Sequence, residues 1–254
     1  MVRDAPSNAS PARTASPAAH LIATKGMLFR GQDTSAFAFQ GFYWTSPYEP
    51  RISEWKQRTF MLRLGLYGGS FDPVHHAHLI LARQALEDLK LDRVIFIPAA
   101  ESPFKPGNTA ASAEDRLEMI RVAIRDEPAF TVDSIEIDRE PPSYTIHTVK
   151  AYKAQYPGEK LILLVGEDHL ESLPKWNDFD ELTQIVNFAI LSRSGLPLRV
   201  NYPVVRRRID LSSTEIRQRV ANNLPISYLV PENVLRYINE NNLYRGEELS
   251  ERRN

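Results

Sequence analysis

The strongest constraint on the fold is one short stretch in which an apolar run, a glycine turn and a helical pattern follow one another. Leu62 to Tyr67 form the apolar run, which predicts a buried strand, and Gly68 and Gly69 open the turn. In α/β proteins this succession binds phosphate, because the turn presents backbone N–H groups and the helix N-terminus adds partial positive charge. The sequence therefore predicts a phosphate site directly after the first strand.

The residues after the two glycines suit an anionic ligand. Backbone N–H groups around Ser70 and Phe71 are expected to contact phosphate, and Pro73 is expected in the first helical turn, where a missing N–H costs nothing. His75 and His78 lie three residues apart, so on a helix they would share one face and hold one anion together. The alternative is a tight turn with solvated histidines.

Residues 68–78, Gly-Gly-Ser-Phe-Asp-Pro-Val-His-His-Ala-His, resemble the GxFDPxHxGH signature of the nucleotidyltransferase superfamily. Its adenylyl- and cytidylyltransferases join a nucleoside triphosphate to a phosphate-bearing acceptor. The form of the stretch is most similar to the nicotinate-nucleotide adenylyltransferase family. Ala77 stands where the pattern has glycine, and its methyl group is expected to tighten the approach of the backbone to phosphate.

Composition excludes several classes of protein. The 254 residues allow one large domain or two small ones, and a formal charge of −1 argues against a nucleic-acid binder driven by bulk charge. The absence of cysteine excludes disulfides and cysteine-based zinc sites and fits a cytoplasmic enzyme. No apolar run approaches the roughly 20 residues that a membrane span needs.

Residues 1–60 differ from the rest of the chain. Met1 to Ala23 is rich in Ala, Ser and Pro and is predicted to be disordered, whereas Phe37 to Trp55 is aromatic but lacks a clean period. The second segment is either a docking segment or not native protein, since Met61 stands where enzymes of the resembled family begin. We predict a nucleotidyltransferase domain over 61–246 and a frayed tail over 247–254. If residues 1–60 are disordered or not native, a chain that starts at Met61 is expected to keep full stability and activity, whereas a docked segment would make the shortened chain less stable.

Strands and helices alternate through this predicted domain. Further strands are expected at 93–97, 130–137, 160–165, 188–191 and 204–209, with helices after Ser112, after Ser143 and after Ser212 or Ser213, and a closing helix over 231–244. This alternation predicts an α/β fold: a doubly wound, Rossmann-like, mostly parallel sheet in a single domain with a small C-terminal helical part. Arg116 lies off the apolar face of its helix and is predicted to be a surface or salt-bridge residue.

Two loops after strands carry further candidate ligands for ATP. The loop Ala99–Ala111 has one cation, Lys105, and the family places a lysine of such a Pro-flanked loop near the phosphates. Gly166 and Asp168 follow the strand 160–165, at the end where open α/β sheets bind ligands, and match the family's GxDxxxxLxxW element. A solvated lysine and an exposed turn aspartate are the alternatives.

Two more elements resemble the family. Ser143, Tyr144 and Thr145, with Ser143 as the expected N-cap, match the residues that hold nicotinate mononucleotide there. Trp176 completes the GxDxxxxLxxW element, where the tryptophan lies against the nicotinate ring, and Asn177 follows it. His147 stands where the family has an acid and is predicted to lie at the surface.

The stretch from Leu211 to Arg217 resembles the superfamily's (I/S)SSTxIR element, which holds the triphosphate tail. Ser212 or Ser213 is expected to cap a helix whose first N–H groups, with Thr214 and Arg217, face the anion. Read alone, this pattern is merely a capped helix. Combined with the first signature, in this order and at this distance, it is specific.

The resemblance implies transfer of the adenylyl group of ATP to nicotinate mononucleotide, giving deamido-NAD and pyrophosphate in NAD biosynthesis. This chemistry needs no protein nucleophile, so catalysis is positioning and stabilisation of charge by the cations His75, His78, Lys105 and Arg217. His78 is expected at the α-phosphate and Arg217 at the leaving pyrophosphate. Mg²⁺ is expected to accompany ATP, bound mostly through water and phosphate rather than by a dedicated protein metal site.

Two alternatives remain open. One is another transferase of the superfamily, such as phosphopantetheine adenylyltransferase or a cytidylyltransferase, against which Tyr144 and Trp176 argue. The other is a non-catalytic metal- or ligand-binding protein that uses the histidines and Asp168, which would need a further close ligand. Acid or amide preference for the acceptor and a monomeric or homo-oligomeric state stay undecided.

Overall fold

The computed structural model describes residues 61–100, 110–140 and 142–245. The expectations for residues 1–60, for Lys105 and for the tail over 247–254 lie outside these described residues.

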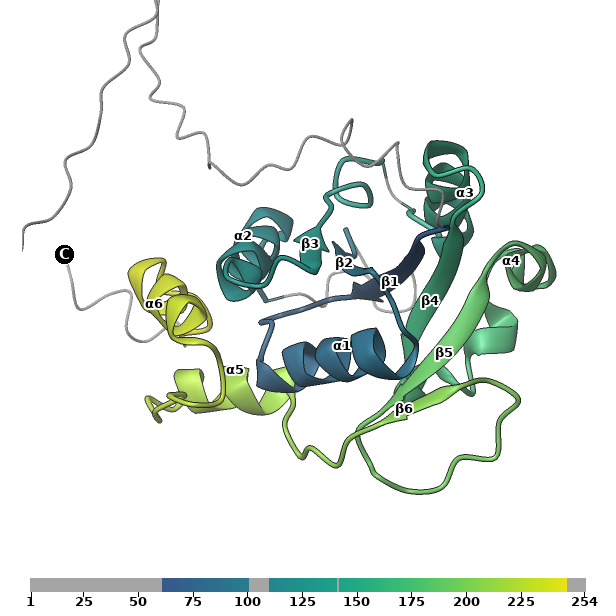
Figure 1. Ribbon diagram of the computed structural model, residues 1–254. Coiled ribbons are helices and arrows are strands. Elements are labelled where there is room, and N and C mark those ends of the chain that lie inside the picture. The colour runs from purple at the N-terminus through teal and green to yellow at the C-terminus, as the bar shows by residue number, and fades with distance from the viewer. Residues whose placement is uncertain (1–60, 101–109, 141, 246–254) are drawn as a thin grey trace, which may run out of the picture. The chain divides into compact units, whose positions relative to one another are not determined.

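Six parallel strands form one sheet in the order β3-β2-β1-β4-β5-β6, which confirms the predicted doubly wound α/β fold (Figure 1). The strands are β1 (Arg63–Gly69), β2 (Arg93–Pro98), β3 (Phe130–Val132), β4 (Lys160–Gly166), β5 (Asn187–Ser192) and β6 (Val204–Arg206). β3 and β6 are shorter than predicted. β3 ends because Asp133 turns the chain, its carboxylate accepting a hydrogen bond from the N–H of Ile135 at 2.9 Å.

Helices cover both faces of the sheet (Figure 1). Those on one face are α1 (His76–Asp88), α2 (Ala113–Ile124), α5 (Ser213–Ala221) and α6 (Glu232–Glu240). Those on the other are α3 (Thr145–Gln155), α4 (Phe179–Ile185) and the 3₁₀ turn η3 (Leu173–Lys175), with a further 3₁₀ turn, η2 (Glu167–His169), directly after β4. None of the helices in the described part of the chain is both long and apolar enough to cross a membrane.

The core has two halves, one on each face of the sheet, and the strands supply both. In β4, Ile162 and Leu164 pack on the α1 face, whereas Leu161, Leu163 and Val165 pack on the α3 face. A strand covered on both sides needs apolar residues at consecutive positions, so the continuous apolar run predicted a central strand correctly.

Two helix starts differ from the prediction. α1 begins at His76 with His75 as N-cap, while Pro73 lies earlier in the turn, where the Asp72–Pro73 peptide is cis. α3 has Tyr144 rather than Ser143 as N-cap, and the Ser143 hydroxyl instead accepts a hydrogen bond from Arg139 at 2.8 Å. His75 therefore does not stand on the helical face where the spacing placed it.

The face of α1 that packs on the sheet also differs in detail. Helical spacing in the sequence predicts that Leu79, Ala82, Leu86 and Leu89 form this face. The fully buried residues are Ala77, Leu81, Ala82 and Ala85, with the three other leucines of the expectation only partly buried beside them. The methyl group of Ala77 is thus buried in the protein interior.

Candidate active site

The candidate site lies at the carboxyl edge of the sheet, between β1 and β4. Because all six strands are parallel, their carboxyl ends meet at one edge, and the chain leaves β1 toward β2 on one side and reaches β4 on the other. Ligands of open α/β sheets bind at such a switch point. Gly69 ends β1 here and Gly166 ends β4. A Cβ on Gly68 would meet no atom within 4 Å, whereas one on Gly166 would collide with the Asp168 carboxylate.

Asp72 is the buried anchor of the turn after β1. Its carboxylate accepts hydrogen bonds from the N–H of Ala110 at 2.7 Å and of Ala111 at 3.2 Å. The hydroxyl of Tyr244, 172 residues away, donates to the same carboxylate at 2.7 Å. Burial and the Asp72 charge raise the pKa of Tyr244, so its hydroxyl stays protonated and keeps donating. Asp72 thus joins the signature turn to the end of the described chain.

We expect Tyr244→Phe to lower the free energy of unfolding by about 1.5–3 kcal/mol, because it removes a hydrogen bond to a buried carboxylate. Urea denaturation of the two proteins measures this difference. Tyr228→Phe is the matched control, since Tyr228 is 92% exposed and its loss of a hydroxyl should change stability by less than about 0.5 kcal/mol. Equal stability of the Tyr244 variant and the wild type would contradict the assigned role.

The two signature elements meet at this turn. The hydroxyl of Ser213 donates to the carbonyl of Pro73 at 2.9 Å, and the Arg217 guanidinium donates to the carbonyl of Asp72 at 2.7 Å. Ser212 is the N-cap of α5, its hydroxyl accepting from the N–H of Glu215 at 3.1 Å, which decides between the two serines. The start of α5 and its arginine therefore lie against the turn after β1.

His75 and His78 form a stacked pair at the start of α1. Their ring centroids are 3.8 Å apart with the planes inclined by 25°. The N–H of His75 donates to Nδ1 of His78 at 3.3 Å, so a neutral His78 carries its proton on Nε2. His75 is only 1% exposed, and neither nitrogen of its ring has a hydrogen-bond partner among the described residues. An unpaired buried polar group costs about 1–3 kcal/mol, which an anionic ligand would offset.

Both imidazoles are neutral in the ligand-free protein near pH 7, which differs from the expectation that they are cations. Burial, with the positive charge of Arg193 and the neighbouring His76, lowers the pKa of His75 to about 3. Burial, with His75 and Arg193, holds the pKa of His78 well below its ordinary value. A neutral imidazole still donates one hydrogen bond, so His78 can bind phosphate through Nε2 without a full charge.

We expect the free energy of unfolding to fall as the pH drops from about 6.5 toward 3. In this window the histidines protonate in the unfolded chain, while His75 stays neutral in the folded one, so the unfolded state binds more protons. Each such group increases the slope by at most about 1.4 kcal/mol per pH unit. Urea denaturation at several pH values measures it. His75→Asn should flatten the slope, because an amide side chain binds no proton in either state. An unchanged slope in His75→Asn would refute the prediction.

Glu167 is a site residue that sequence reasoning passed over in favour of Asp168. Its carboxylate accepts hydrogen bonds from the hydroxyls of Ser192 and Ser194 at 2.7 and 2.9 Å and from the N–H groups of Arg193 and Ser194 at 2.9 and 2.8 Å. Burial alone would raise the pKa of Glu167, but these hydrogen bonds outweigh it and lower the pKa. Glu167 therefore ties the ends of β4 and β5 together, while the Asp168 side chain is 62% exposed and open to a ligand.

Arg193 is a second residue that the sequence analysis did not single out. It follows β5 at the carboxyl edge, and its guanidinium donates to the carbonyl of Leu211 at 3.0 Å. Its charge adds to the effect of burial in lowering the pKa values of His75 and His78, and it opposes the rise that burial causes in the pKa of Tyr67. Arg193 thus contributes positive potential at the histidine pair. A cation directly after a predicted strand was the signal that could have identified it.

The residues expected at the acceptor gather on the α3 face of the sheet. Tyr144 and Trp176 both pack, partly buried, against the same half of the core. The indole nitrogen of Trp176 is buried without a hydrogen-bond partner in the described part of the chain. Thr145 is the first residue of α3, and Asn177 is exposed, donating to Asp178 at 2.8 Å. His147 is exposed, as predicted.

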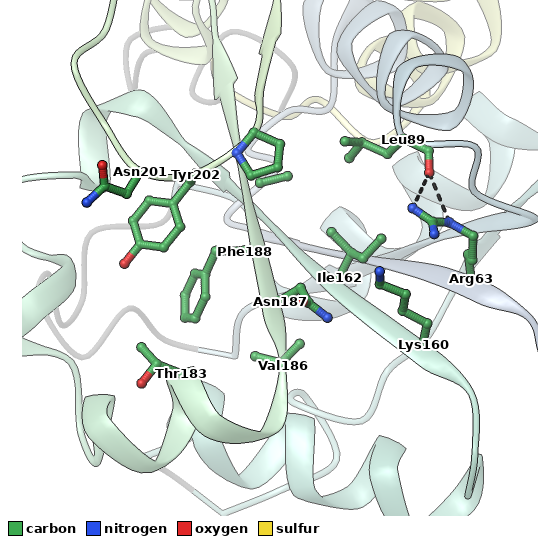
Figure 2. Close-up of a pocket in the computed structure, with 12 residues that line it drawn as sticks. Arg63, Leu89, Lys160, Ile162, Thr183, Val186, Asn187, Phe188, Asn201 and Tyr202 are labelled. Atoms are coloured by element: carbon green, nitrogen blue, oxygen red, sulfur yellow. Dashed lines mark hydrogen bonds between the residues drawn. The ribbon is translucent and has the colours of Figure 1, made fainter.

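The structure has a pocket of about 330 Å³ at the opposite edge of the sheet (Figure 2). Arg63, Lys160 and Asn187, which begin β1, β4 and β5, line it, and the Arg63 guanidinium donates to the carbonyl of Leu89 (Figure 2). It is separate from the histidine pair.

Across residues 61–100, 110–140 and 142–245, no three His, Asp or Glu side chains gather so that they could hold a metal ion.

Comparison with known proteins identifies the family. Residues 66–219 match the Cytidylyltransferase-like family. A "Probable nicotinate-nucleotide adenylyltransferase" of Methylacidiphilum infernorum is 44% identical over 194 residues, which cover 74% of this chain and 95% of the relative. The "Nicotinate-nucleotide adenylyltransferase" of Bacillus subtilis is 37% identical over 189 residues, which cover 73% of this chain and all of the relative.

A solved structure has the same fold. It is "Plasmodium falciparum nicotinic acid mononucleotide adenylyltransferase complexed with NaAD", with a TM-score of 0.61 and 18% identity. The match covers 72% of this chain and 97% of that one. Together with the two relatives and with the signatures that meet at the carboxyl edge, this places the chain in the nicotinate-nucleotide adenylyltransferase family of nucleotidyltransferases.

Proposed function

We propose that the protein transfers the adenylyl group of ATP to nicotinate mononucleotide and releases deamido-NAD and pyrophosphate. The observation that carries this proposal is the stacked pair His75 and His78 at the junction of the two signature elements, with both nitrogens of the buried His75 ring unpartnered among the described residues. The family of the chain agrees with it. Its substrates are two small phosphate-bearing molecules.

The ATP half of the site would use the turn after β1 and the start of α5. Backbone N–H groups from Gly68 to Phe71 would contact the phosphates, and Nε2 of His78 would donate to the α-phosphate. Ser212, Ser213 and Thr214 lie at the N-terminus of α5, where free N–H groups and the helix dipole favour an anion. Arg217 would bind the pyrophosphate, with Gly166 and Asp168 bordering the nucleotide and Lys105 adding charge.

The acceptor half would lie on the α3 face. Trp176 and Tyr144 would hold the nicotinate ring between aromatic surfaces, and Ser143, Thr145 and Asn177 would supply polar contacts. The phosphate oxygen of the acceptor attacks the α-phosphorus of ATP, a new P–O bond forms, and the bond to the β-phosphate oxygen breaks. The pyrophosphate leaves with the electron pair, so the protein need only align the groups and stabilise charge.

Magnesium fits this scheme as a part of the substrate. The described residues offer no cluster of carboxylates or histidines for a resident ion, and the Asp72 carboxylate is already occupied by protein donors. Mg²⁺ ordinarily keeps several waters and binds nucleotide phosphates with one or two carboxylates. Asp168, exposed beside the site, is the carboxylate that would approach it.

Pyrophosphate release by the purified protein tests the proposal. ATP is supplied with nicotinate mononucleotide, nicotinamide mononucleotide or phosphopantetheine in turn, and the product is identified by mass spectrometry. We expect deamido-NAD with the first acceptor, and competition between the first two decides acid or amide preference. No product with either mononucleotide, or turnover with phosphopantetheine alone, would overturn the proposal.

A further inference from the structure

Arg116 is the largest fully buried side chain that the proposed reaction does not use. It lies in α2, is 0% exposed, and makes no ion pair among the described residues, which contradicts its predicted surface position. Its guanidinium instead donates three hydrogen bonds to backbone carbonyls. One nitrogen bonds to Ser70 at 2.9 Å and to Ala99 at 2.7 Å, and the other to Ala100 at 3.0 Å. These carbonyls belong to the chain just after β1 and just after β2.

The bond to Ser70 fixes one particular peptide unit of the signature turn. The Ser70 carbonyl and the Phe71 N–H belong to the same planar peptide and point in opposite directions. When Arg116 holds the carbonyl, the N–H must point away from Arg116. Among the described residues, the Phe71 N–H donates to no protein group. This is one of the donors that the proposed function assigns to phosphate.

The same peptide precedes a backbone conformation that needs support. Phe71 has φ 48°, in the left-handed region that costs a non-glycine residue about 1 kcal/mol or more. Its ring lies edge-on to His78, with centroids 5.0 Å apart, and to Tyr67 at 5.3 Å. A change in the Ser70–Phe71 peptide would therefore move the ring against which the His78 imidazole packs.

We propose that Arg116 is a positioning residue, which orients the Ser70–Phe71 peptide and, through the Phe71 ring, His78 for phosphate binding. The proposal rests on the proposed function, because it names what aligns that site. A point charge cannot replace Arg116, since three carbonyls from two loops need the several donors of a planar guanidinium. A misplacement of about 1 Å at such a site typically reduces the rate on the order of 10²-fold.

Steady-state kinetics of Arg116→Met and Arg116→Lys test the proposal. We expect kcat/KM for ATP to fall on the order of 10²-fold in Arg116→Met and less in Arg116→Lys, while KM for nicotinate mononucleotide stays within twofold. Arg121→Met is the matched control on the same helix, because the Arg121 side chain is 55% exposed and should be silent. In Arg116→Ala, millimolar guanidinium should restore activity in part, and it should not stimulate the wild type.

Several outcomes would overturn the proposal. A folded Arg116→Met protein with kcat/KM for ATP within twofold of the wild type would do so. If Arg116→Met does not fold, an Arg116→Lys protein whose kcat/KM for ATP equals that of the wild type would overturn the proposal instead. A lack of rescue by guanidinium, with equal losses for both substrates, would show that the residue supports the fold alone. If the wild type itself makes no deamido-NAD, the proposed function fails, and calorimetric titration with ATP still decides whether Arg116→Met weakens nucleotide binding.

Discussion

Arg217→Ala is expected to lower kcat on the order of 10³-fold or more, the largest effect that we expect from any single side chain. In adenylyl transfer, negative charge grows on the departing pyrophosphate, and arginines that stabilise such charge contribute factors of this size. Arg217 lies one turn into α5, and its guanidinium already points to the signature turn, where it donates to the carbonyl of Asp72. Single-turnover measurements of pyrophosphate release would give the effect directly.

Two further variants make the Arg217 experiment specific. Arg217→Lys should recover only part of the loss, because a point charge replaces a planar fork of donors. Arg236→Ala removes an exposed arginine that pairs with Glu232 on α6, and it should leave kcat unchanged. The melting temperature must be recorded for each variant, since Arg217 also joins α5 to the turn. Wild-type turnover in a folded Arg217→Ala protein would remove this residue from the mechanism.

His78→Ala is expected to lower kcat 10²–10³-fold and to leave KM for ATP within a few-fold. Removing one fixed donor from charge that develops in the transition state typically costs roughly 2.7–4 kcal/mol. The structure sharpens the reason: Nδ1 of His78 accepts from the backbone, so Nε2 carries the proton that is donated. A loss of kcat at nearly constant KM is the pattern of an interaction made mainly in the transition state.

His76→Ala is the control for His78→Ala and should be nearly silent. His76 is the first residue of α1 and only partly buried, and its backbone N–H donates to the carbonyl of Leu229 at 3.2 Å. An alanine keeps that bond. Equal losses at positions 76 and 78 would show that the assignment of His78 to the α-phosphate is wrong.

Local features of the sequence predicted most of the architecture. Consecutive apolar residues in 160–165 predicted a strand buried on both faces, and serine before a helical pattern predicted the caps of α2 and α5. These features are local because hydrophobic period and capping depend on residues a few positions apart. The errors also have local causes. His75 was assigned to a helical face by its spacing from His78, although the turn with Pro73 delays the start of α1 to His76.

The sequence by itself determined the alternating fold, the place of the glycine turn after the first strand and the family, because each depends on short patterns along the chain. Only the tertiary structure decided the electrostatics of the site. The neutral state of His75 depends on burial and on Arg193, which is 118 residues away in the chain. The bonds of Arg116 to Ser70 and of Tyr244 to Asp72 likewise join residues 46 and 172 positions apart. Burial and hydrogen-bond partners are properties of the packed chain, so no pattern of neighbouring residues could reveal that a polar side chain such as Arg116 lies in the interior.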